Sequence, residues 1–387
     1  MINIRTLNKI AKCGLDAFDE KYNIADECEN PDGIILRSFS MHEMELPESL
    51  KAVARAGAGT NNIPIDKCSE KGIVVFNTPG ANANAVKELV IAGLLLGSRD
   101  IVGGVNWVKT LKGDPDAAKK TEKGKSAFKG VEIEGKTLAV VGLGAIGVMV
   151  ANAAHALGMD VIGYDPYISV KSALGLTRSI HISSDILDTV KNADYVTLHV
   201  PLNDSTRGFI NDEVIGAMKD GAVVLNFARD ALVNDEAMAK ALSAGKIAKY
   251  VTDFPNPAVL EMENAVVIPH LGASTEESED NCAVMACRQM VDYLENGNIV
   301  NSVNMPAAHL PVTGDPRICI FHQNVPDMIA KITSLISSNG INIENMVNAS
   351  KKGAKYAYTL LDVLQVPDGI EDALKAIEGV MRVRTIK

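Results

Sequence analysis

The chain has 387 residues, of which 47% are hydrophobic and 22% are charged, and its formal net charge is −10 at pH 7. This length suggests about two or three domains, and the acidic charge argues against a broad nucleic-acid-binding surface. The sequence lacks the run of about 18 apolar residues that a membrane helix needs. The first residues also lack a signal-peptide core, so we expect a cytoplasmic protein.

The cysteines and histidines indicate neither a disulfide framework nor a metal site. No two cysteines form a C-x-x-C pair, and the seven histidines do not cluster at metal-ligand spacing. We therefore predict free, buried thiols in a reducing compartment. The cysteines are Cys13, Cys28, Cys68, Cys282, Cys287 and Cys319.

Short apolar segments alternate with turns and helix-like segments over residues 1–98, for example at 33–36, 52–56 and 72–76. This alternation is typical of βα units on a parallel sheet. The lysine-rich segment 109–129 is predicted to be a solvated loop. A second βα series follows and predicts a doubly wound parallel sheet. Its six predicted strands are 137–141, 160–164, 195–199, 222–226, 248–252 and 266–268.

The motif Gly142-x-Gly144-x-x-Gly147 lies between a predicted strand and a helix-like segment. Such glycines allow a tight turn, a close approach of the backbone to a pyrophosphate, and close packing of the helix on the strand. Asp165 ends the next strand about twenty residues later, where an acid binds ribose hydroxyls and repels a 2′-phosphate. The sequence therefore predicts a dinucleotide site that prefers NAD.

Two side chains with suitable chemistry follow later strands of this series. His270 follows the last strand and could accept a proton from a hydroxyl group. Arg229 follows strand 222–226 and could bind a carboxylate with its two-pronged guanidinium. Since ligands of such sheets bind at the carboxyl ends of strands, we expect both residues in one active site.

The remaining sequence predicts a long helix over 274–295, a proline-bearing linker over 305–316, and a tail with the order βαββαβ. This order is typical of a ferredoxin-like sandwich. The predicted tail elements are strand 318–321, helix 325–338, strands 343–349 and 356–364, helix 370–377 and strand 381–386.

These features together resemble the D-isomer-specific 2-hydroxyacid dehydrogenases over essentially the whole chain. The resemblance implies an α/β protein with two Rossmann-like doubly wound domains, plus a small tail that resembles the amino-acid-binding ACT domain. The implied domains are 1–98 with 285–312 for substrate, 99–284 for NAD, and 315–387 for the tail. The matching segments are Arg37-Ser38, 55–61, 77–95, 142–147, 198–202, 226–229 and 269–272.

The resemblance also assigns roles to individual residues. It implies that Arg229 binds the substrate carboxylate, that His270 is the acid/base, and that Lys125 reaches a phosphate. It further implies substrate contacts from Arg37, Ser38, Arg55, Ala58 and Gly59. The implied cofactor contacts, besides the three glycines and Asp165, are Ala145, Ile146, Pro201, Thr206, Phe227, Ala228, Asp253, Gly272 and Ala273.

One segment departs from the family pattern. The family has Asp-Val-Phe-x-x-Glu-Pro, whose Glu orients the catalytic histidine, whereas this chain has residues 253–257, Asp-Phe-Pro-Asn-Pro. Asn256 stands in place of the Glu. Either Asp253 becomes the partner of His270, or Asp253 keeps a nicotinamide contact and His270 has no carboxylate partner.

The tail carries the polar residues of an ACT-type serine site, namely His322, Asn324 and Asn342. Asp327 replaces a family glycine, and aspartate tolerates unusual backbone angles better than most residues. The resemblance implies L-serine as an effector bound between two tails. A tail that only dimerises is the alternative.

Within the family, the chain is most similar to members that oxidise 3-phospho-D-glycerate with NAD. Another D-2-hydroxyacid dehydrogenase, of the type that reduces glyoxylate or hydroxypyruvate, is the first alternative. A non-catalytic NAD-sensing protein is the second, although Arg229 and His270 argue against it. A homodimer or homotetramer is expected, with no nucleic-acid or membrane partner.

Overall fold

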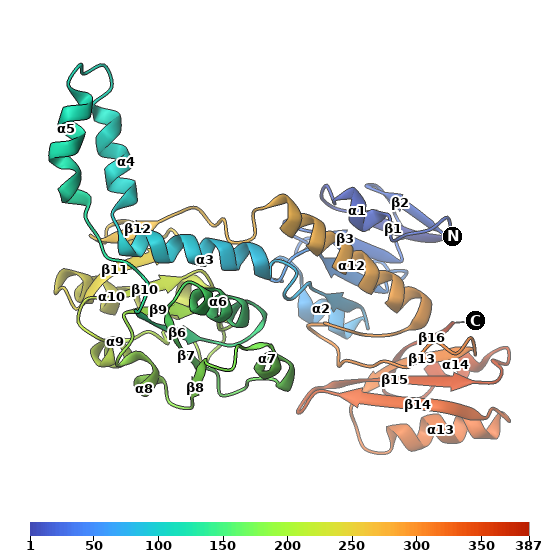
Figure 1. The fold of residues 1–387 in the computed structure, drawn as a ribbon. Helices are drawn as coiled ribbons and strands as arrows, with labels where there is room; N and C mark the ends of the chain where they lie inside the picture. The colour runs from blue at the N-terminus through green and yellow to red at the C-terminus, as the bar shows by residue number, and fades with distance from the viewer. Residues whose placement is uncertain (387) are drawn as a thin grey trace. The chain divides into compact units, whose positions relative to one another are not determined.

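The computed structural model describes residues 1–386 (Figure 1). The chain divides into two compact units, Met1–Asn82 with Glu279–Lys387, and Ala83–Ser278. We refer to them, after the roles that the sequence predicts for them, as the substrate unit and the nucleotide unit. The first boundary lies before helix α3 (Ala83–Ser98), whereas the sequence suggested a boundary after residue 98. The reason is packing, because the apolar side chains of α3 join the core beneath the sheet of the nucleotide unit.

The nucleotide unit contains a seven-stranded parallel sheet with the order β12-β11-β10-β9-β6-β7-β8. All six predicted strands are confirmed, and the short edge strand β8 was missed. The strand order reverses between β6 and β9, and ligands of doubly wound sheets bind at such a switch point. The strands are β6 (Thr137–Val141), β7 (Asp160–Tyr164), β8 (His181–Ser183), β9 (Tyr195–Leu198), β10 (Ala222–Asn226), β11 (Ile247–Thr252) and β12 (Ala265–Val267).

The lysine-rich segment is not the predicted loop but a helical hairpin that projects from the sheet of its unit (Figure 1). Asp100 caps α4 by accepting a hydrogen bond from the amide of Gly103. Between the two arms of the hairpin, the rings of Trp107 and Phe128 lie 5.4 Å apart. The prediction was wrong because a lysine-rich segment can be helical where it projects into solvent, and neither helix of the hairpin has a buried residue. The helices of this unit, besides α3, are α4 (Ile101–Thr110), α5 (Ala117–Gly124), η1 (Lys125–Phe128), α6 (Ala145–Ala156), α7 (Val170–Gly175), α8 (Ile186–Val190), α9 (Asp212–Ala217), η2 (Asp230–Leu232), α10 (Asp235–Ser243) and α11 (Pro257–Leu260).

The substrate unit contains a second parallel sheet, with the order β2-β1-β3-β4-β5. One face of this sheet packs against the long helix α12 (Glu276–Asn296), whose apolar side chains join its core. The other elements are β1 (Ile2–Thr6), α1 (Lys12–Leu15), β2 (Tyr22–Ala25), β3 (Gly33–Leu36), β4 (Ala52–Arg55), α2 (Ile65–Glu70) and β5 (Val74–Phe76).

The tail has the predicted βαββαβ order and forms an antiparallel sheet with the order β14-β15-β13-β16. Asp327, at the start of its first helix, has a left-handed φ of 67°, so the aspartate does adopt the conformation that a glycine would take. The tail elements are β13 (Arg317–Gln323), α13 (Met328–Ser338), β14 (Ile343–Ser350), β15 (Tyr356–Val363), α14 (Ile370–Lys375) and β16 (Val380–Ile386).

The two faces of the tail sheet have different neighbours. Ile318 and Ile320 belong to a core shared with the tail helices. Cys319 and Phe321 alternate with them and join the core of the substrate unit, which includes Tyr293 of α12. The tail is therefore packed into the substrate unit and is not a separate body.

Within residues 1–386, no helix is both long and apolar enough to cross a bilayer. The cysteines are free, but the prediction of buried thiols holds for only four of the six. Cys13 is exposed and Cys28 is half-buried. For Cys68 and Cys287, burial raises the pKa of the thiol to about 12, which keeps them unreactive.

Candidate active site

The glycine turn follows β6 at the switch point of the nucleotide unit. Gly142 has a left-handed φ of 95°, and a Cβ there would lie 2.7 Å from the carbonyl carbon of His199. A Cβ on Gly147 would lie 1.8 Å from the carbonyl oxygen of Gly142. Gly144 begins α6 with no side-chain cap. Uncapped amides at a helix start bind phosphate groups well, so this turn fits a dinucleotide pyrophosphate.

Asp165 lies directly after β7, beside the glycine turn. One carboxylate oxygen accepts a hydrogen bond from the amide of Leu143 at 2.9 Å, and the other accepts one from Tyr167 at 2.8 Å. Each oxygen keeps a further lone pair, so the carboxylate can still accept hydrogen bonds from ribose hydroxyls. This geometry suits the predicted role of Asp165.

The loop after β9 contributes two predicted cofactor residues. The hydroxyl of Thr206 donates to the carbonyl of Pro201 at 2.6 Å, which closes the loop upon itself. His199, which sequence reasoning missed, precedes this loop, and burial lowers the pKa of its imidazole to about 3. The ring is therefore neutral at physiological pH, and its Nε2 lies 3.1 Å from the hydroxyl of Thr197.

Arg229 is presented by a loop that Asn226 holds in place. The Asn226 amide donates to the carbonyl of Arg229 at 2.9 Å and its side-chain oxygen accepts from the amide of Ala228 at 3.2 Å. Phe227, which lies between Asn226 and Ala228 in the chain, is buried and packs against Gly93. The Arg229 guanidinium itself is exposed, so it is available to a ligand.

Asp253, His270 and Arg229 form one electrostatic group in the nucleotide unit. The Asp253 side chain is buried, and one of its oxygens accepts a hydrogen bond from the amide of Gly272 at 3.1 Å. The other oxygen is buried without a hydrogen-bond partner. Burial raises the pKa of the Asp253 carboxyl, while the positive charges of His270 and Arg229 favour its ionised form.

The His270 ring stands against an aromatic neighbour. The centroids of the Phe254 and His270 rings lie 4.7 Å apart. The imidazole is otherwise exposed to solvent. The short loop that departs from the family pattern thus supplies both an acid and an aromatic ring to the neighbourhood of His270.

Asn256, which stands where the family has Glu, is engaged elsewhere. Its side-chain oxygen caps α11 by accepting from Val259 at 2.8 Å. Its amide donates to the carboxylates of Asp230 and Asp235, each at 3.0 Å. These bonds use the donors and the acceptor of the amide, so Asn256 serves the local fold.

The predicted substrate residues Arg37 and Ser38 lie on one loop of the substrate unit. Asn8, which sequence reasoning missed, holds that loop with its side-chain oxygen, which accepts from the amides of Arg37 at 2.9 Å, Ser38 at 3.1 Å and Phe39 at 3.0 Å. An asparagine two residues after the end of a strand was the available signal. The Arg37 guanidinium forms an ion pair of 2.6 Å with Glu279.

The other predicted substrate residues lie on the neighbouring loop of the same unit. Arg55 Nε donates to the carbonyl of Arg37 at 3.0 Å, which ties the two loops together. The carbonyl of Ala58, next to Gly59, accepts from Asn77 at 2.7 Å. The structure thus brings Arg37, Ser38, Arg55, Ala58 and Gly59 together on adjoining loops.

Lys125 belongs to the other unit, the nucleotide unit. It begins η1 at the end of the helical hairpin and forms an exposed ion pair of 2.5 Å with Glu122. Neither side chain is buried, so the pair adds little stability, and the phosphate role of Lys125 remains a prediction.

The three predicted effector residues differ in exposure. Asn324 and Asn342 are exposed, and Asn342 donates to Glu344. His322 is buried, with Nδ1 near the carbonyl of Gln323 at 2.8 Å and Nε2 near the hydroxyl of Thr359 at 2.9 Å. Both ring nitrogens are therefore satisfied inside the tail, and burial lowers the pKa of His322.

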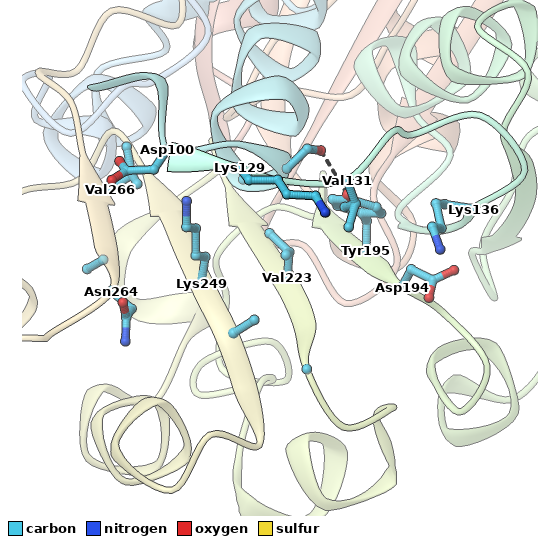
Figure 2. Close-up of a pocket in the computed structure, with 15 residues that line it drawn as sticks. Asp100, Lys129, Val131, Lys136, Asp194, Tyr195, Val223, Lys249, Asn264 and Val266 are labelled. Atoms are coloured by element: carbon cyan, nitrogen blue, oxygen red, sulfur yellow. Dashed lines mark hydrogen bonds between the residues drawn. The ribbon is translucent and has the colours of Figure 1, made fainter. Parts of the chain in front are cut away.

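A cavity of about 630 Å³ in the nucleotide unit is not part of this site. Figure 2 shows it at the amino ends of β9, β10, β11 and β12, whereas the glycine turn, Arg229 and His270 follow carboxyl ends. Lys249 lines it and donates to the carbonyl of Leu96 at 3.5 Å, near the end of α3. A cation there offsets the negative end of the helix dipole.

A doubly wound sheet with this glycine turn and Asp165 defines a dinucleotide-binding domain of the dehydrogenase type. Comparison with known proteins agrees. Residues 96–272 match the family described as "D-isomer specific 2-hydroxyacid dehydrogenase, NAD binding domain". NAD is therefore the cofactor, and the turn, the helix start and Asp165 are suited to hold it.

Several relatives are named D-3-phosphoglycerate dehydrogenase. The relative from Escherichia coli is 32% identical over 88% of this chain and 82% of its own length. The relative from Methanocaldococcus jannaschii is 35% identical over 78% of this chain, which spans only 57% of that protein. The chain therefore belongs to the D-isomer-specific 2-hydroxyacid dehydrogenase family.

Solved structures show the same fold. The NAD+-bound 3-phosphoglycerate dehydrogenase of Entamoeba histolytica has a TM-score of 0.60 and 26% identity, covering 78% of this chain and 98% of that one. A glyoxylate reductase from "Paecilomyes thermophila" has a TM-score of 0.64 and 25% identity with the same coverage.

Proposed function

We propose that the chain oxidises 3-phospho-D-glycerate to 3-phosphohydroxypyruvate with NAD, the first step of L-serine synthesis. The observation that carries the proposal is the electrostatic group of His270, Arg229 and Asp253 after strands of an NAD-binding sheet. The names of the relatives favour the phosphorylated substrate. The chemistry requires a base, a group that binds the substrate carboxylate, and a hydride acceptor. Bound NAD supplies the hydride acceptor.

In this proposal His270 removes the proton from the substrate hydroxyl as the hydride leaves the same carbon. Arg229 binds the substrate carboxylate and stabilises negative charge that develops on the reacting oxygen. The exposure of both side chains permits these contacts.

Asp253 takes the place of the missing family Glu. A nearby carboxylate stabilises the imidazolium that forms on His270 when it accepts the proton. Support comes from the unpartnered oxygen of Asp253, because a buried carboxylate oxygen with no donor is stabilised most by a neighbouring positive charge. The commitment of Asn256 to α11, Asp230 and Asp235 leaves Asp253 as the acid for this role.

The substrate unit is proposed to hold the rest of the substrate. Arg37, Ser38 and Arg55 offer cationic and hydroxyl donors for the phosphate, and the backbone at Ala58 and Gly59 offers amides. Lys125 is proposed as a further cation for the phosphate.

The test is NADH formation from 3-phospho-D-glycerate, beside NADH formation from a panel of non-phosphorylated 2-hydroxy acids. We expect the phosphorylated substrate to have the highest kcat/KM. The likeness to a glyoxylate reductase makes the non-phosphorylated acids the second candidate. Their preference over 3-phospho-D-glycerate would contradict the main proposal, and NAD binding without any turnover would indicate a sensor.

L-Serine is proposed as an effector bound between two tails of a homo-oligomer. Asn324 and Asn342 are exposed and offer amide donors and acceptors for a zwitterion. Both ring nitrogens of His322 are hydrogen-bonded within the tail. His322 is therefore proposed to support the serine site without contacting serine directly. Asn342→Ala should keep the basal rate and lose sensitivity to serine. A wild-type protein that neither binds serine at millimolar concentration nor changes its rate would indicate a tail that serves assembly or binds another amino acid.

A further inference from the structure

Helix α12 contacts one of the loops that carry the predicted substrate residues directly and reaches the other through Asn77. Near its start, Glu279 forms the ion pair with Arg37. Three turns later, Gln289 Nε2 donates to the carbonyl of Asn77 at 3.1 Å. Asn77 in turn donates to the carbonyl of Ala58 at 2.7 Å. A relay of two amides thus runs from α12 to the loop that carries Ala58 and Gly59.

The side chain of Gln289 is better explained by this relay than by packing. Its oxygen is buried and has no hydrogen-bond partner, which costs free energy. Methionine has similar length and would avoid that cost. The Nε2 donor, shared between Asn77 and the carbonyl of Met285 at 3.1 Å, is what methionine could not supply.

The far end of α12 is held by the tail. Arg384 donates to the carbonyls of Tyr293 at 2.6 Å and Leu294 at 3.1 Å, and its guanidinium lies 4.5 Å from the centroid of the Tyr293 ring. Arg317 donates to the carbonyl of Asn296 at 2.6 Å. The last carbonyls of a helix have no partner within the helix and carry its negative end, so two arginines there stabilise it.

We propose that Gln289 is a positioning residue for the Ala58–Gly59 loop, and that Arg384 of the tail fixes the helix that carries Gln289. The tail thereby sets the affinity for substrate without contacting it. This inference rests on the proposed function only in that it takes the Ala58–Gly59 loop to bind the substrate.

The first experiment needs no activity. Hydrogen exchange of the amides of residues 57–61 is followed in the unliganded full-length protein. Gln289→Met should speed their exchange at least threefold, because the loop loses its support. Arg288→Gln is the matched control, since Arg288 is exposed on the same helix and should leave exchange unchanged. Unchanged exchange in Gln289→Met would overturn the relay, whether or not the protein is a dehydrogenase.

The second experiment is steady-state kinetics with the 2-hydroxy acid that the wild type oxidises best. Gln289→Met should raise KM for the acid about tenfold, with kcat within twofold of wild type and NADH affinity unchanged. Gln289→Glu keeps the shape of the side chain but lacks the Nε2 donor, so it should show the same changes in KM and kcat as Gln289→Met. A fall in kcat at constant KM, or an equal loss of NADH affinity, would overturn a positioning role. Inactivity of the wild type towards every acid, with altered exchange in Gln289→Met, would refute the proposed function and leave the relay standing.

The contribution of the tail is tested by Arg384→Met. It should raise KM about threefold, and the double variant with Gln289→Met should show less than the product of the two single effects, because both act through one helix. Fully multiplicative effects would show that Arg384 acts independently of Gln289 and would overturn the part assigned to the tail.

Discussion

At the residue scale, the charge beside His270 is the most telling feature. Asp253→Asn removes a carboxylate whose charge interacts with that of the imidazole. We expect kcat/KM for oxidation to fall about 10- to 100-fold, because the imidazolium that forms on His270 loses a stabilising neighbour, while KM for NAD stays unchanged. An unchanged rate together with a raised KM for NAD would assign Asp253 to the nicotinamide instead.

His270 itself should be needed for chemistry and not for cofactor binding. His270→Ala should lower kcat by about 10²–10⁴-fold while the Kd for NADH, measured by fluorescence titration, stays within twofold. Arg229→Ala is the comparison, since it should raise KM and lower kcat together. A His270→Ala enzyme with near-normal turnover would rule out the proposed acid/base.

Cofactor choice should depend on Asp165. Asp165→Ala removes the acceptor for the ribose hydroxyls and the charge that repels a 2′-phosphate. The Kd for NADH should rise about tenfold, which corresponds to about 1.4 kcal/mol of binding free energy. The ratio of the Kd for NADPH to the Kd for NADH should become smaller. Parallel titrations with both cofactors measure this. A wild-type protein that already prefers NADPH would contradict the ribose role.

At the element scale, helix α13 begins at a residue in an unusual conformation. Asp327 has a φ of 67°, which is unfavourable for residues with a Cβ and most unfavourable for β-branched ones. Asp327→Gly should leave the stability unchanged or raise it by about 0.5 kcal/mol, and Asp327→Val should lower it by about 1–2 kcal/mol. Urea unfolding measures both, and equal stability of the two variants would show that this turn relaxes freely.

The elements differ in how far they could be predicted. The strands of the nucleotide unit and the βαββαβ tail follow from apolar periodicity and turn residues, and both are confirmed. The helical hairpin of α4 and α5 was missed because neither helix has a buried residue and the apolar side chains of α4 remain largely exposed. Strand β8 was missed because it has three residues at a sheet edge, too few for a periodicity.

At the scale of the whole molecule, the tail and the substrate unit share a core and should unfold together. The buried ion pair between Arg317 and Asp362 lies at their junction, with N–O distances of 2.6 and 3.2 Å. Asp362→Ala leaves the buried guanidinium without its carboxylate and should cost about 3–5 kcal/mol.

Hydrogen exchange under increasing urea would follow both regions at once. In Asp362→Ala, the tail strands and strands β3 and β4 should lose protection at one common urea concentration. This concentration should be lower than in the wild type. A tail that opens in Asp362→Ala while β3 and β4 remain protected to the wild-type urea concentration would show two independent folding units.

Local spacing and residue type were enough to establish the class of fold and the glycine turn, and they predict the roles of Asp165, Arg229 and His270. The tertiary structure decided the roles that depend on neighbours distant in the chain. Asn8 holds the loop of Arg37, Asn256 caps α11, and Gln289 supports Asn77, all through side-chain bonds that no local pattern predicts. The packing of the tail into the substrate unit was likewise decided by long-range burial, since a sheet face buries against whichever apolar surface the fold brings to it.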